Sequence, residues 1–280
     1  MQPIHFFNGQ FLPKEEIKFS IDDVGLLRGY SVFEYFKAYK GIPVFMKDHL
    51  YRFENSADLF GIKIPISRPK IEEAILRMLG QNKYPISGIK ILLTGGNSAN
   101  GFSAGKPNMA MLNLETEDSS KEYYSQGVSV MSHNFTREFP QAKTTNYASA
   151  VKLESDWKQK GHLDVLYHDG QWVSEVARSN VFVVLGDKLI TNQGDVLPGV
   201  TRSKVVEMAP SLGFELEIRP FSLEEVLGAD EFFMTSTNKR VMPIVKVDDH
   251  LIANGLVGAK TKKLMTAFDQ LIKKEISSGL

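Results

Sequence analysis

The sequence predicts a mixed α/β (α+β) protein with two domains, and two observations support this. Short apolar runs of strand character alternate with segments of helical spacing along the whole 280-residue chain. A polar stretch, LETEDSSKEYYSQG at about 114–127, separates two parts that are each long enough to bury a core. We therefore expect an N-terminal α/β domain of residues 1–115, a linker at 116–126 and a C-terminal domain of residues 127–280.

The first domain is expected to begin with two hairpins, which turn at Asn8-Gly9 and at Lys40-Gly41. Apolar residues at helical spacing predict a helix from Asp48 to Gly61, and another helix is expected at 68–79. Strands at 88–94 and 108–114 flank a glycine-rich loop, GGNSANGFSAGKP. These elements predict one mixed α/β domain.

The second domain shows the same alternation. A hairpin is expected to turn at Asp169-Gly170. Helices are predicted at 147–160 and 200–212, and strands at 128–132, 180–185, 215–219, 231–235 and 242–247.

The composition excludes several classes of function. Lys plus Arg equal Asp plus Glu at 33 each, so no net charge favours nucleic acid. The absence of cysteine excludes disulfides, thiolate nucleophiles and Cys-ligated metals, and we expect no metal site. No apolar run approaches about 18 residues, which predicts a cytoplasmic protein without a membrane partner.

Three features, in chain order, provide what pyridoxal phosphate (PLP) chemistry requires. Lys143 in QAKTTNYASAVKLE supplies an amine for a Schiff base, and Glu175 in DGQWVSEVARSNVF supplies a carboxylate that keeps the pyridine nitrogen protonated. The turn in DVLPGVTR opens a helix whose first N–H groups bind a phosphate. Taken singly, these features are also typical of a surface lysine, a solvent-facing strand glutamate and an ordinary Pro-Gly turn.

The order and the residues of these motifs resemble those of the fold-type IV (class IV) PLP-dependent aminotransferases. That family includes D-amino-acid transaminases, which this chain resembles most, as well as branched-chain aminotransferases and aminodeoxychorismate lyase. The resemblance runs from Phe7-Asn8-Gly9 to Val245-Lys246-Val247-Asp248. It implies two mixed domains with the cofactor in the cleft between them, a pseudo-barrel C-terminal domain that carries the PLP lysine, and a homodimer.

The resemblance also assigns cofactor roles. Lys143 would carry PLP and move the Cα proton, Glu175 would bind the ring nitrogen, and Tyr147 would lie near the ring. Arg52, in His49-Leu50-Tyr51-Arg52, matches the family's phosphate arginine, although a surface ion pair with Asp48 is an alternative. The remaining cofactor-binding residues implied are Asn180, Val200, Thr201, Ser236 and Thr237.

The chain departs from the usual D-amino-acid transaminase at the substrate carboxylate. Asn100 and Phe102 occupy the family's Arg and His positions, and Phe33 replaces its tyrosine. Two arginines, Arg28 and Arg178, stand instead where the family is usually uncharged. Our hypothesis is that Arg178 and Arg28 of the partner subunit bind this carboxylate with bidentate geometry. The alternative is that both are surface residues or pair with Glu34, Asp23 or Glu175.

Three further residues are expected at the substrate. Lys90 matches a basic position that faces the active site in the branched-chain enzymes and the lyase, and it would receive a distal carboxylate of glutamate or 2-oxoglutarate. An exposed strand lysine is the alternative. Tyr30 and Phe33 would line the pocket, or belong to the core. The predicted reaction transfers the amino group of a D-amino acid (D-alanine or D-glutamate type) to 2-oxoglutarate or pyruvate. Alternatives are a branched-chain L-aminotransferase, then aminodeoxychorismate lyase, and finally a catalytically silent homologue that binds PLP or a protein.

Overall fold

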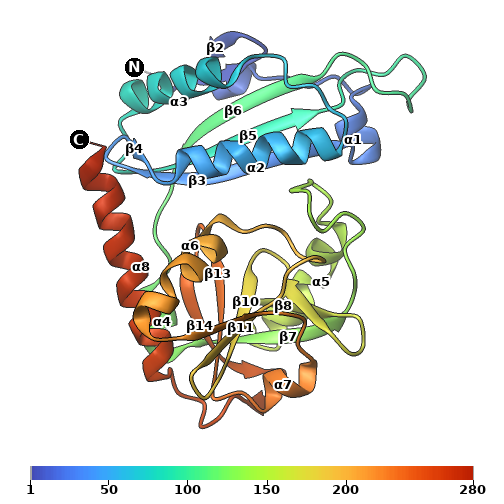
Figure 1. Ribbon diagram of the computed structural model, residues 1–280. Coiled ribbons are helices and arrows are strands. Elements are labelled where there is room, and N and C mark those ends of the chain that lie inside the picture. Colours follow the sequence, from blue (N-terminus) through green and yellow to red (C-terminus); the bar gives the residue numbers. More distant parts are fainter. Residues whose placement is uncertain (1, 280) are drawn as a thin grey trace. The chain divides into compact units, whose positions relative to one another are not determined.

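The computed structural model describes residues 2–279 of the chain, which form two compact units. The N-terminal unit contains residues 2–117, 142–146 and 274–279 of the described chain, and the C-terminal unit contains 118–141 and 147–273. Each unit has its own sheet and its own helices, as Figure 1 shows. The mixed α/β class predicted from the sequence is confirmed.

The N-terminal unit contains an antiparallel sheet with strand order β2-β1-β6-β5-β3-β4. Its strands are β1 (His5–Phe7), β2 (Gln10–Leu12), β3 (Ser31–Tyr39), β4 (Ile42–Pro43), β5 (Ile86–Thr94) and β6 (Asn108–Glu115). Its helical segments are a 3₁₀ turn (Lys14–Glu16), α1 (Val24–Arg28), α2 (Met46–Leu59) and α3 (Arg68–Asn82). The apolar sides of α2 and α3 share one core with the sheet.

The alternation of side chains along β3 matters for the site. Val32 and Phe36 are fully buried in the core that α2 and α3 cover. Because successive side chains of a strand point to opposite faces, Phe33 and Tyr35 lie on the other face of the sheet. Glu34 shares the core face and is fully buried, so it needs a partner there.

The C-terminal unit contains a sheet with the order β12-β11-β10-β13-β14-β7-β8-β9, with β15 paired to β14. Its strands are β7 (Val128–Asn134), β8 (Asp164–His168), β9 (Val173–Val176), β10 (Asn180–Leu185), β11 (Lys188–Thr191), β12 (Glu215–Ile218), β13 (Glu231–Ser236), β14 (Arg240–Val247) and β15 (His250–Leu251). Parallel pairs β7–β8, β7–β14 and β11–β12 occur among antiparallel ones.

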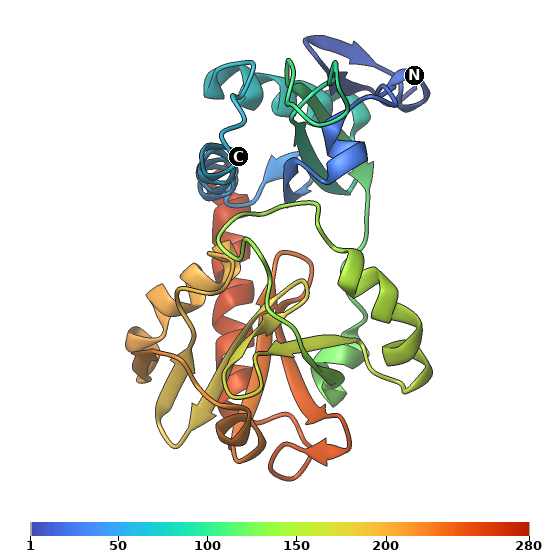
Figure 2. The same ribbon diagram turned by 90° about the vertical axis from the view of Figure 1, so that its right-hand side faces the viewer.

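The helices that begin in this unit are α4 (Lys121–Gln126), α5 (Ala148–Gln159), α6 (Val200–Met208), a 3₁₀ turn (Pro210–Leu212), α7 (Leu223–Leu227) and α8 (Ala259–Ser278). Contacts of α5 with β8 and of α6 with β13 place these helices over different parts of the sheet, which Figure 2 shows in yellow-green and orange. Within residues 2–279, no helix is both long and apolar enough to cross a bilayer.

The predicted hairpins, strands and helices are present, with ends that differ by a few residues. The helix expected at 200–212 ends at Met208, because Pro210 lacks the N–H that an α-helix needs, and a 3₁₀ turn follows. Seven elements were not anticipated, namely the 3₁₀ turn Lys14–Glu16, α1, α4, β11, α7, β15 and α8. Of these, α4 falls inside the segment that was expected to be a linker.

Candidate active site

Lys143 lies in the short segment 142–146 of the N-terminal unit and is fixed there through its backbone. Its carbonyl accepts a hydrogen bond from the N–H of Phe33 at 2.8 Å, and its N–H donates to Oγ of Ser56 on α2 at 3.1 Å. The neighbouring Thr144 forms a bridge to Val32 on β3. The position of Lys143 is therefore set by β3 and α2 and does not depend on its own side chain.

Two predicted site lysines lie beside the ring of Phe33. Nζ of Lys143 lies 4.4 Å from the centroid of the Phe33 ring, and Nζ of Lys90 lies 5.6 Å from it. Lys90 faces Tyr35 across the β3–β5 pair, on the sheet face that also carries Phe33. The structure thus groups Lys143, Phe33 and Lys90, and their contact with cofactor or substrate stays a prediction.

Tyr30 has a different environment. Its hydroxyl donates to the carbonyl of Phe60, and the two rings lie 5.7 Å apart. Its side chain thus connects the residue before β3 with the end of α2. A contact of Tyr30 with substrate stays a prediction.

Arg52, the predicted phosphate arginine, forms a buried bidentate pair with Glu34. Its Nε lies 2.9 Å from Oε2 of Glu34 and its Nη2 lies 2.6 Å from Oε1. Nδ1 of His49 lies 3.0 Å from the same Oε1. Burial alone would raise the pKa of Glu34, but the Arg52 charge and the His49 contact outweigh it and hold that pKa far below its ordinary range. Glu34 therefore stays ionised and fixes the orientation of the Arg52 guanidinium.

His49 predicts a pH dependence of stability. Burial lowers its pKa from the ordinary value of 6.5, despite the nearby Glu34 carboxylate. Below pH 6.5 the unfolded chain therefore binds a proton at this histidine that the folded chain does not bind. The stability that the neutral His49 contributes is complete above pH 6.5 and is lost as the pH falls. We expect the free energy of unfolding to decrease on acidification by up to about 1.4 kcal/mol per pH unit per such histidine.

Thermal unfolding of the wild type and of His49→Gln, between about pH 7 and about pH 5.5, measures this effect. The variant is expected to show a shallower slope. It will not be flat, because burial also lowers the pKa values of His5 and His162. Equal slopes would show that His49 does not take up the proton.

Glu175, the predicted ring-nitrogen acid, is buried on β9 in the C-terminal unit. Its Oε1 accepts a hydrogen bond from Nη1 of Arg137 at 2.6 Å, and its Oε2 accepts from the N–H of Leu197 at 3.1 Å. These donors stabilise the ionised carboxylate and fix its direction. Arg137 was not singled out from the sequence, where 38 residues separate it from Glu175 and no motif marks it.

The expected phosphate turn is built around Asn180. Its Nδ2 donates to the carbonyl of Leu197 at 2.8 Å. A Cβ at Gly199 would lie only 1.9 Å from Oδ1 of Asn180, so this close approach requires glycine. Val200 and Thr201 then begin α6, and a glycine before them has no side chain with which to cap their N–H groups. Such a helix start suits a phosphate.

The second predicted phosphate loop adjoins the first. Asn180 pairs with Thr235 in the β10–β13 register, Ser236 ends β13, and Thr237 follows in the turn to β14. The buried hydroxyl of Thr235 has no hydrogen-bond partner among the described residues. Backbone N–H groups, hydroxyls and an oriented carboxylate are thus linked within one unit, which fits the donor set that PLP requires.

Arg178 lies in the turn between β9 and β10, and its side chain is 54% exposed. Its Nε and Nη2 each lie 3.2 Å from Oδ2 of Asp164. Arg28 ends α1, is exposed, and donates from Nη1 to the carbonyl of Leu27 at 3.2 Å. Binding of a carboxylate by Arg178 and Arg28 stays a prediction.

The three acids considered as alternative partners of these arginines have other contacts. Glu34 binds Arg52 and Glu175 binds Arg137. Asp23 accepts hydrogen bonds at the start of α1, from the N–H of Gly25, and from Thr94 and Asn108. The acid that does bind Arg178, Asp164, was not considered.

Tyr147 precedes α5 and packs against a small cluster that includes Phe135, Tyr167 and Ala177. Burial, followed by the negative charge of Asp164, raises the pKa of Tyr167 to about 12, so its hydroxyl keeps its proton. Ala177 directly precedes Arg178, so this cluster adjoins the β9–β10 turn, and a place of Tyr147 near the cofactor ring stays a prediction. Tyr167 itself was not anticipated, since a strand tyrosine gives no distinctive signal.

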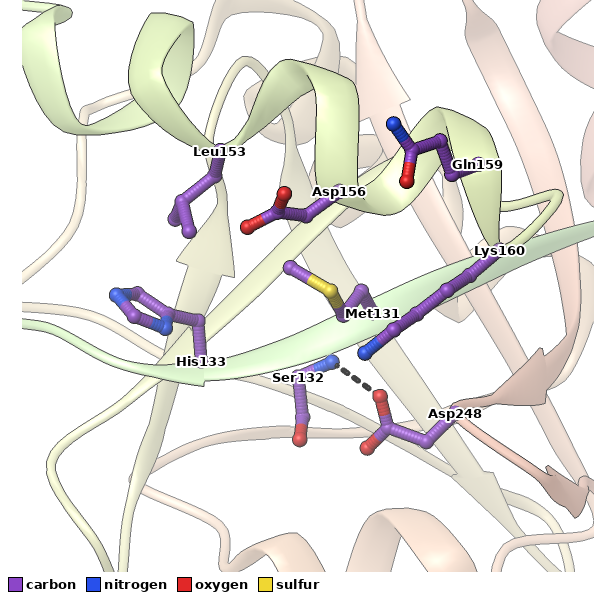
Figure 3. Close-up of a pocket in the computed structure, with 8 residues that line it drawn as sticks. All are labelled: Met131, Ser132, His133, Leu153, Asp156, Gln159, Lys160 and Asp248. Carbon is purple, nitrogen blue, oxygen red and sulfur yellow. Dashed lines mark hydrogen bonds between the residues drawn. The ribbon is translucent and has the colours of Figure 1, made fainter.

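A pocket of about 380 Å³ lies elsewhere in the C-terminal unit, between α5, β7 and the end of β14 (Figure 3). One of its polar contacts is a hydrogen bond from the N–H of Ser132 to Oδ1 of Asp248 at 2.8 Å. None of the predicted site residues lines it. The chemistry of the side chains described above, and not this pocket, therefore marks the candidate active site.

Comparisons with known proteins identify the family of the chain. The family model described as "Amino-transferase class IV" matches residues 31–247. The D-alanine aminotransferase of Staphylococcus epidermidis is 28% identical, with 96% of this chain and 97% of that protein covered. The branched-chain-amino-acid aminotransferase of Salmonella typhimurium is also 28% identical, over 96% of this chain and 93% of that protein.

Solved structures give the same result for the fold. The T.th. branched-chain amino acid aminotransferase, solved with pyridoxamine 5'-phosphate, superposes with a TM-score of 0.90 at 27% identity. The match covers 98% of this chain and 95% of that one. Similar proteins therefore include both D-specific and branched-chain enzymes, and similarity alone does not select the substrate.

Proposed function

The chain belongs to the class IV aminotransferases and uses PLP, and from this premise we propose that it transfers the amino group of a D-amino acid. The donor is of the D-alanine or D-glutamate type, and the acceptor is a 2-oxo acid such as 2-oxoglutarate or pyruvate. The observation that carries the proposal is a surplus of positive charge beside the turn that follows Glu175. There, Arg178 and the buried Lys239 share the single carboxylate of Asp164.

Bound PLP supplies an electron sink for the carbanion character that develops at the substrate Cα. Nζ of Lys143 would hold the cofactor covalently and, once the substrate amine has displaced it, the free amine would act as the base that removes and returns the Cα proton. Glu175 keeps the ring nitrogen protonated, with Arg137 orienting its carboxylate. The phosphate is held by Arg52 and by the cluster around Asn180, formed by Val200, Thr201, Ser236 and Thr237.

The substrate α-carboxylate binds to Arg178 and to Arg28 of the partner subunit, in a cytoplasmic homodimer. The half-exposed guanidinium of Arg178 supports this role, because its 3.2 Å contacts with Asp164 leave further N–H groups for a ligand. Lys90 receives a distal carboxylate, which its place beside the Phe33 ring with Lys143 supports.

A branched-chain L-aminotransferase is the second candidate, since similar proteins of that specificity match most of the chain. Two arginines in one small substrate site, as proposed for Arg28 and Arg178, argue against a purely apolar side-chain pocket. The Asn100 and Phe102 that replace the Arg and His trap argue against an ordinary D-amino-acid transaminase. Aminodeoxychorismate lyase ranks third. A catalytically silent homologue is opposed by the ordered environment of Glu175 and by the anchored segment of Lys143.

A substrate panel tests the proposal. The D and L forms of alanine, glutamate and leucine are offered to the PLP-loaded enzyme with 2-oxoglutarate or pyruvate as acceptor. We expect turnover of D-alanine or D-glutamate, and faster turnover of L-leucine would select the branched-chain alternative instead.

Arg178→Ala tests the carboxylate role within the same assay. Loss of charge-assisted hydrogen bonds is expected to raise KM for the amino acid by about 10-fold to about 100-fold. The visible absorbance of the lysine-bound cofactor should stay unchanged. Arg219→Ala, which removes another partly exposed, ion-paired arginine of the same unit, is the matched control. An unchanged KM in Arg178→Ala would remove Arg178 from the substrate site.

A further inference from the structure

We propose that Lys239 is a positioning residue for substrate binding, which keeps the Asp164 carboxylate occupied so that Arg178 is available to the substrate. This inference rests on the proposed function, because it assumes that the carboxylate of the substrate binds to Arg178. It concerns the C-terminal unit alone, in which all three side chains lie.

The three groups meet at one oxygen atom. Oδ2 of Asp164 lies 2.6 Å from Nζ of Lys239 and 3.2 Å from both Nε and Nη2 of Arg178. The other oxygen, Oδ1, accepts a hydrogen bond from the N–H of Val165 at 2.9 Å. Both oxygens of the carboxylate therefore have partners, and two cations share one of them.

Burial decides which cation is the permanent partner. Asp164 is completely buried and the Lys239 side chain is 11% exposed, whereas that of Arg178 is 54% exposed. A contact that is both short and shielded from water is much stronger than a longer one at the surface. Lys239 is thus the principal counter-ion of Asp164, and Arg178 is a weakly held second one.

Lys239 is also fixed in place by its surroundings. Its Nζ lies 3.3 Å from Oγ of Ser179, and its N–H donates to Oγ of Ser236 at 3.2 Å. These contacts connect the turn that carries Arg178 with the turn that carries Thr237. The ammonium group is therefore already in position when the substrate arrives.

The consequence is an exchange of partners at Arg178. When a substrate carboxylate takes the guanidinium, Asp164 remains neutralised by Lys239, so no buried charge is left unpaired. Without Lys239, the same exchange would leave the buried Asp164 carboxylate uncompensated, and Arg178 would be retained by it. Substrate affinity would then fall although Arg178 itself is intact.

The test is an equilibrium titration of the PLP-loaded enzyme with glutarate, a non-reacting dicarboxylate, followed by the absorbance of the bound cofactor. Lys239→Met, and Lys239→Gln as a second neutral variant, are expected to raise the dissociation constant of glutarate by about 10-fold. KM for D-glutamate should rise in parallel, with a smaller change in kcat. Lys239→Arg should keep the dissociation constant within about threefold.

The double variant Lys239→Met/Asp164→Asn separates positioning from a merely structural role. Because it removes both buried charges, Arg178 is again released, and binding is expected to return to within about threefold of the wild type. A double variant that binds as weakly as the single one would overturn the inference. It also contains no isolated buried charge, so it provides a test if the single variants do not fold.

The two proposals fail in different ways. If Arg178→Ala binds glutarate as tightly as the wild type, the proposed role of Arg178 is wrong, and the inference falls with it. If Arg178→Ala weakens binding while Lys239→Met and Lys239→Gln fold and bind normally, only the role of Lys239 is overturned.

Discussion

Lys143→Ala is expected to lower the rate of transamination by at least about 10⁴-fold, because one substitution removes both the covalent anchor and the proton-transferring base. The rate of the first half-reaction with D-glutamate, measured on protein reconstituted with PLP, gives this value. Lys188→Ala, at an exposed lysine paired with Glu217, is the matched control and should retain wild-type activity.

The variant is expected to fold normally. The segment around residue 143 is held by the N–H of Phe33 and by Oγ of Ser56, which contact only its backbone. An unchanged thermal midpoint would show that the loss of activity is chemical. A Lys143→Ala protein that transaminates within tenfold of the wild type would refute the assignment.

Glu175→Gln is expected to lower kcat by about 10²-fold to about 10³-fold, the usual effect of removing one oriented electrostatic group. The amide keeps an oxygen that can accept from Arg137, so the fold and the cofactor content should change little. What is lost is the negative charge that keeps the ring nitrogen protonated. Steady-state rates and the cofactor content of the purified variant measure the two effects separately.

Glu217→Gln, at a glutamate paired with Lys188 and Arg219, provides the control for loss of a carboxylate in the same unit. It should leave kcat unchanged. Wild-type kcat in Glu175→Gln would mean that this acid does not face the cofactor nitrogen.

The sequence predicts the fold class and most elements because strand alternation, helical spacing and turn residues are local signals. The longest helix that was missed, α8, also carries such a signal, since Leu264, Phe268 and Ile272 recur every four residues and are buried. By contrast, α4 has six residues and none is buried, although Tyr124 packs against the core. So short a segment shows no helical periodicity that would distinguish it from a linker.

Some residues of the candidate site were also predictable from local motifs, and others were not. Lys143, Glu175 and the Gly199 turn lie in recognisable local motifs, and the structure gives the latter two a shared contact at Leu197. The groups that orient them are not local. Arg137 lies 38 residues from Glu175, and Lys239 lies 75 residues from Asp164. Pairs of this kind arise only from strand pairing and loop placement, which no motif in a single sequence encodes.

The central claim is that the amine of Lys143 holds the cofactor, and chemical reduction tests it most directly. The purified protein is treated with borohydride, which fixes PLP to the lysine that carries it, and the labelled peptide is identified by mass spectrometry. We predict one phosphopyridoxyl group per chain, on Lys143. A label on any other lysine, with Lys143 unmodified, would contradict the account.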